Sequence, residues 1–143
     1  MFRGRAERLE FLLVHPGGPF WKNKAAGAWS VPKGEIQERE DGLAAAKREF
    51  KEELGFEPTG EFIALSPIKQ KGGKVVRVWA FEGDCQPSAC KSNTFEIEWP
   101  PRSGKLVKFP EVDQVAFFGI SEAAIKINPA QLALLQELAE KVK

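Results

Sequence analysis

Residues 41–54 constrain the fold of this chain most, because their apolar side chains recur with the period of an α-helix. Asp41 stands where a helix N-cap is expected, and Gly55 follows the last turn, where glycine commonly ends a helix. The apolar positions share one face: Leu43, Ala46, Phe50 and Leu54. Because an amphipathic helix has to bury its apolar face, the pattern predicts a helix packed on a sheet.

A second face of the same predicted helix is acidic. Glu49, Glu52 and Glu53 stand at spacings of three and four residues, which bring their carboxylates together over one turn. Exposed like charges at such spacings repel by about 0.2–0.5 kcal/mol per pair. A divalent cation among them would relieve that repulsion, and oxygen ligands favour Mg²⁺ or Mn²⁺. A solvated charged face, partly neutralised by basic neighbours on the helix, is the alternative.

The rest of the chain alternates predicted strands, turns and two further helices. Strands are expected over residues 8–15, 28–31, 61–70, 75–82, 94–99 and 112–120, with a hairpin turn at 71–74 and an irregular segment at 84–92. Helices are expected over 121–126 and from Pro129 onward, the last with a buried leucine stripe. This mixture predicts an α/β (or α+β) layered fold, and the length of 143 residues fits one domain, residues 1–143.

Charge and cysteine content exclude several function classes. Lys plus Arg total 21 and Asp plus Glu 20, a net charge of +1, which argues against a nucleic-acid binder that relies on electrostatics. No apolar run approaches the length of a membrane helix, so no membrane partner is expected. Two cysteines and one histidine are too few for a closed zinc site or a disulfide framework, and a cytoplasmic location is expected. Cys85 and Cys90 are interpreted as non-catalytic.

The acidic helix lies inside a longer spaced motif, G-x5-E-x7-R-E-φ-x-E-E-x-G-φ, over residues 34–56, in which φ is apolar. Its fixed positions are Gly34, Glu40, Arg48, Glu49, Glu52, Glu53 and Gly55, with Phe50 and Phe56 at the apolar positions. The motif resembles the signature of the Nudix hydrolases, and every fixed position matches. The resemblance implies an α/β/α sandwich with a central mixed sheet and a loop–helix–loop catalytic motif.

The same resemblance implies Mg²⁺-dependent (or Mn²⁺-dependent) cleavage of a diphosphate linkage in a nucleoside diphosphate joined to another group. By motif position, the metal ligands are the carboxylates of Glu49, Glu52 and Glu53 and the backbone carbonyl of Lys33. Four motif residues are implied to be structural: Gly34, Glu40, Arg48 and Gly55. Among these, an ion pair between Glu40 and Arg48 would fasten the loop to the helix.

Catalysis also needs a group that orients or deprotonates the attacking water. Glu52 and Glu53 are candidates within the motif. Outside it, residues 109–118 resemble the family segment that supplies a further glutamate, and Glu111 is the residue expected to act, with an exposed loop carboxylate as the alternative. The rival acids are Glu96, Glu98 and Asp113. His15 follows an apolar strand and is interpreted as a strand-end residue rather than a base.

Substrate-binding candidates lie in two loops and a hairpin. Lys33 is expected to reach a substrate phosphate, whereas Trp21 and Lys22 are expected to stack a base and meet phosphate. Lys69 and Lys71 would contribute to a basic rim for a long polyphosphate. For the tryptophan the alternative is packing, and for the hairpin lysines it is a scattered charged surface.

The sequence therefore predicts hydrolysis of nucleoside polyphosphates, either dinucleoside polyphosphates or nucleoside triphosphates, by water attack on phosphorus. Residues 29–34 (WSVPKG) resemble a W-x-x-P-K-G run of diadenosine tetraphosphate hydrolases, which favours the first substrate class. RNA 5′ ends are a further candidate. A Nudix-fold nucleotide-binding or sensor module that does not hydrolyse is the alternative function. The assembly is expected to be a monomer or homodimer.

Overall fold

The computed structural model describes residues 1–32, 41–69, 73 and 75–143. The described α-helices are α1 (Gly42–Leu54), α2 (Ile120–Lys126) and α3 (Leu132–Lys141), and short 3₁₀ turns cover Ala6–Arg8, Pro87–Ala89 and Pro129–Gln131. The described strands are β1 (Phe2–Arg3), β2 (Glu10–Pro16), β3 (Ile63–Ala64), β4 (Ile68–Lys69), β5 (Val75–Val76), β6 (Trp79–Ala80), β7 (Thr94–Glu98), β8 (Leu106–Pro110) and β9 (Val112–Gly119).

The centre of the fold is the long antiparallel pair of β2 and β9, with β1 on the other edge of β2. The register places Phe11 opposite Phe118 and Leu13 opposite Ala116. Parallel bridges join Phe2 to Glu82 and Trp29 to Ile127, so pairing around this centre is mixed.

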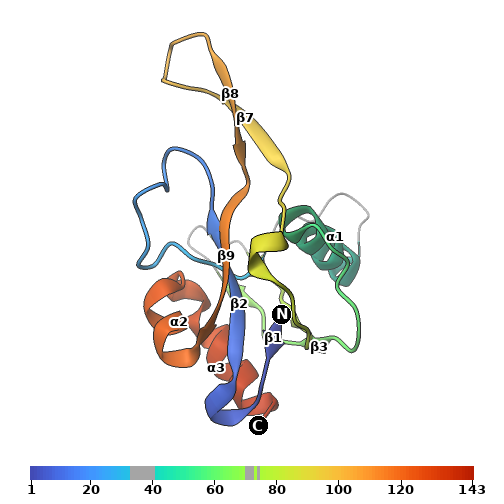
Figure 1. Ribbon diagram of the computed structural model, residues 1–143. Helices are drawn as coiled ribbons and strands as arrows, with labels where there is room; N and C mark the ends of the chain where they lie inside the picture. The colour runs from blue at the N-terminus through green and yellow to red at the C-terminus, as the bar shows by residue number, and fades with distance from the viewer. Residues whose placement is uncertain (33–40, 70–72, 74) are drawn as a thin grey trace.

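Alternate residues of β2 face two different helical layers. Phe11 and Leu13 share one core with the buried leucines of α3, which are Leu134, Leu135 and Leu138. Leu12 and Val14 share the second core with Phe50 and Leu54 of α1. Figure 1 shows α1 on one side of the β2–β9 pair and α2 and α3 on the other. The predicted α/β/α layering is therefore confirmed, because strand side chains alternate between two faces.

Three of the predicted strands differ in extent from the expectation. Residues 28–31 form only isolated bridges, through Ser30 to Val14 and Trp29 to Ile127. The predicted hairpin of residues 61–70 and 75–82 is present, but as two short pairs, β3 with β6 and β4 with β5. The expected turn at 71–74 lies outside the described residues except for Gly73.

A second hairpin was missed by the sequence pattern. The strand predicted over residues 94–99 is β7, and it pairs along its length with β8. The expected break after Trp99 is the connection of this hairpin, closed by a hydrogen bond from the Trp99 amide to the Lys105 carbonyl at 2.9 Å. In Figure 1 the β7–β8 hairpin extends away from the layered body.

Both ends of α1 are defined by the residues that its sequence predicts. The Asp41 carboxylate accepts a hydrogen bond from the Ala44 amide at 3.2 Å, which satisfies one of the free donors of the first turn. Gly55 ends the helix in the left-handed region with φ +87°, and its amide donates to the Lys51 carbonyl. No helix among the described residues is long and apolar enough to cross a membrane.

Replacing Gly55 by alanine is expected to destabilise the fold by more than the strain of a left-handed alanine, which costs about 1–2 kcal/mol. A Cβ at Gly55 would meet the Lys91 carbonyl oxygen at 2.7 Å. Gly60→Ala is the matched control, since Gly60 has φ +100° and a Cβ there would meet no other atom within 4 Å. Urea unfolding measures both. Equal losses for the two variants would show that the Lys91 contact has no energetic weight.

Candidate functional site

The acidic face of α1 points away from the sheet because the opposite, apolar face of the helix packs on it. Phe50 and Leu54 are buried against the sheet, whereas Leu43 and Ala46 are only half-buried and Ala45 takes a buried position instead. Phe50 packs edge-on against Phe56 and Phe81, with ring centroids 5.2 and 5.1 Å apart. Because Phe50 lies between Glu49 and Glu52 in sequence, this aromatic packing fixes the direction in which the acidic face points.

Arg48 binds two of the three motif carboxylates. Its Nη1 lies 2.8 Å from Oε1 of Glu49 and 3.2 Å from Oε1 of Glu52. The Glu49 side chain is 15% exposed and that of Glu52 33%, so neither pair is a fully solvated surface contact. The structure thus places the guanidinium between the carboxylates, where it offsets the repulsion that their spacing creates. Glu53 lies on the same turn and lines a cavity of about 480 Å³ with Ser92 and Gln114.

The pKa of Glu49 shows that Glu111 lies near the acidic face of α1. Burial raises the pKa of Glu49 above its ordinary value, and the Arg48 guanidinium opposes that rise. The carboxylates of Glu52 and Glu111 both add to the rise in the pKa of Glu49. Glu111, which follows β8, therefore lies close enough to α1 for its charge to act on Glu49.

Backbone hydrogen bonds hold the Glu111 segment to α1. The Glu111 amide donates to the Asn93 carbonyl at 2.8 Å, and the Asn93 amide donates to the Glu52 carbonyl at 2.8 Å. The Gly17 amide donates to the Glu111 carbonyl at 2.9 Å, which adds the end of β2 to the same junction. Of the acids outside the motif, Glu111 is the one that these bonds connect to the helix.

The three rival acids have other surroundings. Glu96 and Glu98 lie on the exposed face of β7, and Glu96 is 4.0 Å from Nζ of Lys108. Asp113 contacts Nδ1 of the buried His15 at 2.6 Å, and the other ring nitrogen of His15 contacts the Lys24 carbonyl. His15 lies in β2 as expected, and it links β9 to the loop that follows β2.

The predicted substrate residues that the structure describes lie on two elements, the loop after β2 and strand β4. Trp21 is 40% exposed on the loop after β2, with Lys24 Nζ 5.3 Å from its ring centroid, and Lys22 is exposed beside it. Lys69 is exposed on β4. Four predicted residues lie outside the described residues: Lys33, Gly34, Glu40 and Lys71.

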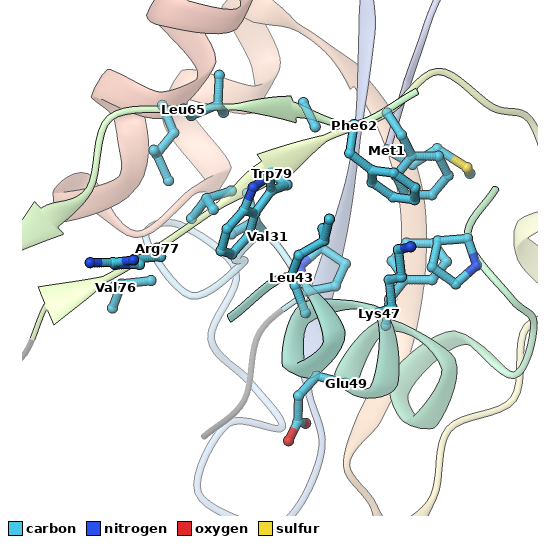
Figure 2. A pocket seen from close by; sticks show the side chains of 18 of the residues that line it. Met1, Val31, Leu43, Lys47, Glu49, Phe62, Leu65, Val76, Arg77 and Trp79 are labelled. Atoms are coloured by element: carbon cyan, nitrogen blue, oxygen red, sulfur yellow. The ribbon is translucent and has the colours of Figure 1, made fainter. Parts of the chain in front are cut away.

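An apolar cavity of about 480 Å³ adjoins the start of α1, and sequence reasoning did not identify it. Figure 2 shows Trp79, Val31 and Leu43 together on one side of the first turns of α1, while Glu49 extends from the helix away from them. Gly42 permits this wall, since a Cβ there would meet the Trp79 ring at 2.9 Å. In the sequence, the only indication of this cavity wall was the aromatic residue Trp79 within a predicted strand.

The chemistry of the acidic face fits a hard divalent cation, because its donors are carboxylate oxygens. In the described part of the chain, however, no three His, Cys, Asp or Glu side chains are grouped closely enough to hold a metal ion. The Oε1 atoms of Glu49 and Glu52 both contact the Arg48 guanidinium.

Comparison with known proteins identifies both a family and a fold. The family model for the NUDIX domain matches residues 1–138. No curated protein matches the chain. Among solved structures, the NUDIX domain of Shewanella oneidensis NrtR complexed with ADP ribose is similar with a TM-score of 0.65 and 18% identity, over 99% of this chain and 83% of that one.

Two further solved structures have the same fold. A binary complex of a C. elegans Ap4A hydrolase is 20% identical with a TM-score of 0.62, over 98% of this chain and 92% of that one. A mutT/nudix family protein from Listeria innocua is 19% identical with a TM-score of 0.60, over 99% of this chain and 88% of that one. At these identities the similarity concerns the fold.

Proposed function

The chain belongs to the Nudix family of hydrolases, and we propose that it cleaves a diphosphate linkage in nucleoside polyphosphates by metal-dependent attack of water on phosphorus. The observation that supports this most strongly is the junction at α1. There Arg48 binds the carboxylates of Glu49 and Glu52, and Glu49 lies within electrostatic reach of Glu111. An apolar cavity of about 480 Å³ begins at the same helix.

We propose that Glu49, Glu52 and Glu53 hold Mg²⁺ or Mn²⁺, together with the backbone carbonyl of Lys33. A bound metal ion would neutralise negative charge on the phosphoryl oxygens and would make a nearby water more acidic. Arg48 keeps the carboxylates of Glu49 and Glu52 at the acidic face and offsets their mutual repulsion before binding. Glu40 and Gly34 are proposed to complete the motif loop that leads into the helix.

We propose that Glu111 is the general base that accepts the proton of the attacking water. Its backbone is held by hydrogen bonds with Gly17 and Asn93, whereas its side chain makes no ion pair with another described residue. A carboxylate with that freedom can accept a hydrogen bond from water and orient it in line with phosphorus. Glu52 and Glu53 are the candidates for this role within the motif.

The cavity is proposed to take the nucleoside part of the substrate. Trp79 and Phe62 supply aromatic faces in its wall, and Arg77 lines it with a positive charge. Stacking of a base on an aromatic side chain accepts any of the bases and contributes about 1–3 kcal/mol per base. Trp21 and Lys22, exposed on the loop after β2, and Lys69 on β4 lie outside the lining and are proposed to meet a second nucleoside or distal phosphates.

Dinucleoside polyphosphates and nucleoside triphosphates are the proposed substrate classes. Solved structures with the same fold include an Ap4A hydrolase and a NUDIX domain complexed with ADP ribose, which supports nucleotides with an internal diphosphate. The panel that tests this contains diadenosine tetraphosphate, common nucleoside triphosphates, ADP-ribose and a 5′-triphosphate RNA, each with Mg²⁺, Mn²⁺ or EDTA. We expect products only with metal.

The alternative is a nucleotide-binding module that does not hydrolyse. The contacts of Arg48 to Glu49 and Glu52 are the observation in its favour, because they occupy two of the proposed ligands. Calorimetric titration of the same nucleotides with the metal-loaded protein distinguishes the two functions. Binding without products under every metal condition would contradict hydrolysis and support the module.

Substitution of Glu111 by glutamine is expected to lower kcat by about 10²-fold, the lower end of what a positioned general base contributes. The thermal midpoint should change little, because the backbone bonds of Glu111 are kept. Glu98→Gln on the exposed face of β7 is the matched control and should leave kcat unchanged. A normal rate in Glu111→Gln would move the base role to Glu52 or Glu53.

A further inference from the structure

Cys85 and Cys90 lie side by side although they take no part in the proposed hydrolysis. Their sulfur atoms are 3.8 Å apart, and both are free thiols. The 3₁₀ turn Pro87–Ala89 folds the intervening residues back on themselves, with the Cys90 amide donating to the Pro87 carbonyl at 3.2 Å. The sequence spacing alone, four residues between the cysteines, does not reveal this proximity.

The two thiols are sheltered but not sealed from solvent. Both side chains are half-buried and pack against the core that contains Phe50 and Leu54 of α1. Cys90 also lines the cavity that Glu53 and Ser88 share. Burial, with the neighbouring Cys85 adding, raises the pKa of the Cys90 thiol to about 12. Cys90 therefore stays protonated near neutral pH, and its reactions should be faster in alkaline solution.

We propose that Cys85 and Cys90 are a redox modification site, at which a low-molecular-weight disulfide converts the thiol pair reversibly into an intramolecular disulfide. A disulfide needs a sulfur separation of about 2.05 Å, so the sulfurs, now 3.8 Å apart, have to approach further by side-chain rotation. This site does not depend on the proposed hydrolysis.

With oxidised glutathione the reaction is two exchanges. The thiolate of one cysteine attacks a sulfur of glutathione disulfide, the bond between the glutathione sulfurs breaks, and one glutathione thiolate leaves. The second cysteine then loses its proton to solvent and attacks the mixed disulfide, which expels the second glutathione. Two protein thiols are oxidised, one glutathione disulfide is reduced, and two glutathione molecules are released.

The cysteine pair directly precedes a segment that is hydrogen-bonded to α1, so a disulfide there should affect the contact with the helix. Immediately after Cys90, the Lys91 amide donates to the Leu54 carbonyl at 3.1 Å, and the Asn93 amide donates to the Glu52 carbonyl at 2.8 Å. A covalent link between Cys85 and Cys90 restricts the residue that directly precedes the segment making these bonds. The oxidised protein should therefore show slower amide exchange at Lys91 and Asn93 than the reduced protein.

The test is titration of the full chain with glutathione redox buffers at mildly alkaline pH, followed by acid quenching, alkylation of free thiols and intact-mass measurement. Because the chain has only two cysteines, loss of two hydrogen atoms identifies the intramolecular bond. We expect both thiols to disappear together, with an equilibrium constant about tenfold or more above that of the urea-denatured chain. Dithiothreitol should restore both thiols.

Cys85→Ser and Cys90→Ser are the matched controls, and each should form only a mixed disulfide with glutathione through its remaining thiol. The proposal is overturned if the native wild-type chain accumulates glutathione adducts. It is equally overturned if the native equilibrium constant is no higher than that of the denatured chain. An unchanged exchange rate at Lys91 and Asn93 in the oxidised protein would overturn the coupling to α1.

Discussion

Substitution of Glu53 by glutamine is expected to reduce hydrolysis about 10³-fold while the protein stays folded. A metal ion contributes several kcal/mol of transition-state stabilisation, and each 1.36 kcal/mol corresponds to about a factor of ten in rate. Glutamine keeps the shape of the side chain and removes the charge that would bind the ion. The measurement is kcat with Mg²⁺ on the best substrate of the nucleotide panel, with circular dichroism as the check on folding.

Glu57→Gln is the control for this variant. Glu57 lies just beyond α1, where its exposed carboxylate is 2.9 Å from Nζ of Lys51. An exposed ion pair of this kind contributes little to stability, so its loss should leave both folding and kcat near the wild-type values. Near-normal turnover by Glu53→Gln would refute the assignment of Glu53 as a metal ligand.

Replacement of Phe50 by alanine is expected to have the largest effect on stability. Phe50 is 5% exposed and is packed edge-on against both Phe56 and Phe81. Truncation of a buried phenylalanine to alanine costs about 3–5 kcal/mol. Domains of this size are stable by about 5–15 kcal/mol, so a large part of the folding free energy would be lost. Urea unfolding followed by circular dichroism gives the value.

The neighbouring Lys51→Ala variant is the control for Phe50→Ala, because Lys51 is exposed on the same helix. Its free energy of unfolding should stay within about 0.5 kcal/mol of the wild type. A loss below about 1 kcal/mol in Phe50→Ala would contradict the view that this side chain anchors the acidic face of α1.

The parts of the fold that sequence predicted are those set by local chemistry. The period of α1, its Asp41 cap and its Gly55 terminus are encoded within a single short segment of the printed sequence, roughly four helical turns. In α3 the same periodicity predicted the burial of Leu135 and Leu138, but it did not predict that Leu134 would be buried and Leu132 only half-buried. The proximity of Glu111 to Glu49 was expected from the family resemblance rather than from spacing.

The parts that sequence missed depend on contacts between distant residues. Strand β8 was not predicted because its partner β7 determines its conformation across the hairpin. The cavity wall at Trp79 forms only because Gly42, far away in sequence, leaves room for the ring. The link from His15 to Asp113 likewise joins residues 98 positions apart.

The most direct test of the proposed metal site is titration of the protein with Mn²⁺, followed by electron paramagnetic resonance of the free ion. This measurement detects binding without any substrate or turnover. We expect the wild-type chain to bind Mn²⁺ in the micromolar to millimolar range, and Glu49→Gln and Glu53→Gln to bind it at least about tenfold more weakly, the scale of one lost interaction with a charge. Glu57→Gln should bind as the wild type does. Equal Mn²⁺ affinity in all four proteins would show that the carboxylates of α1 do not hold the cation.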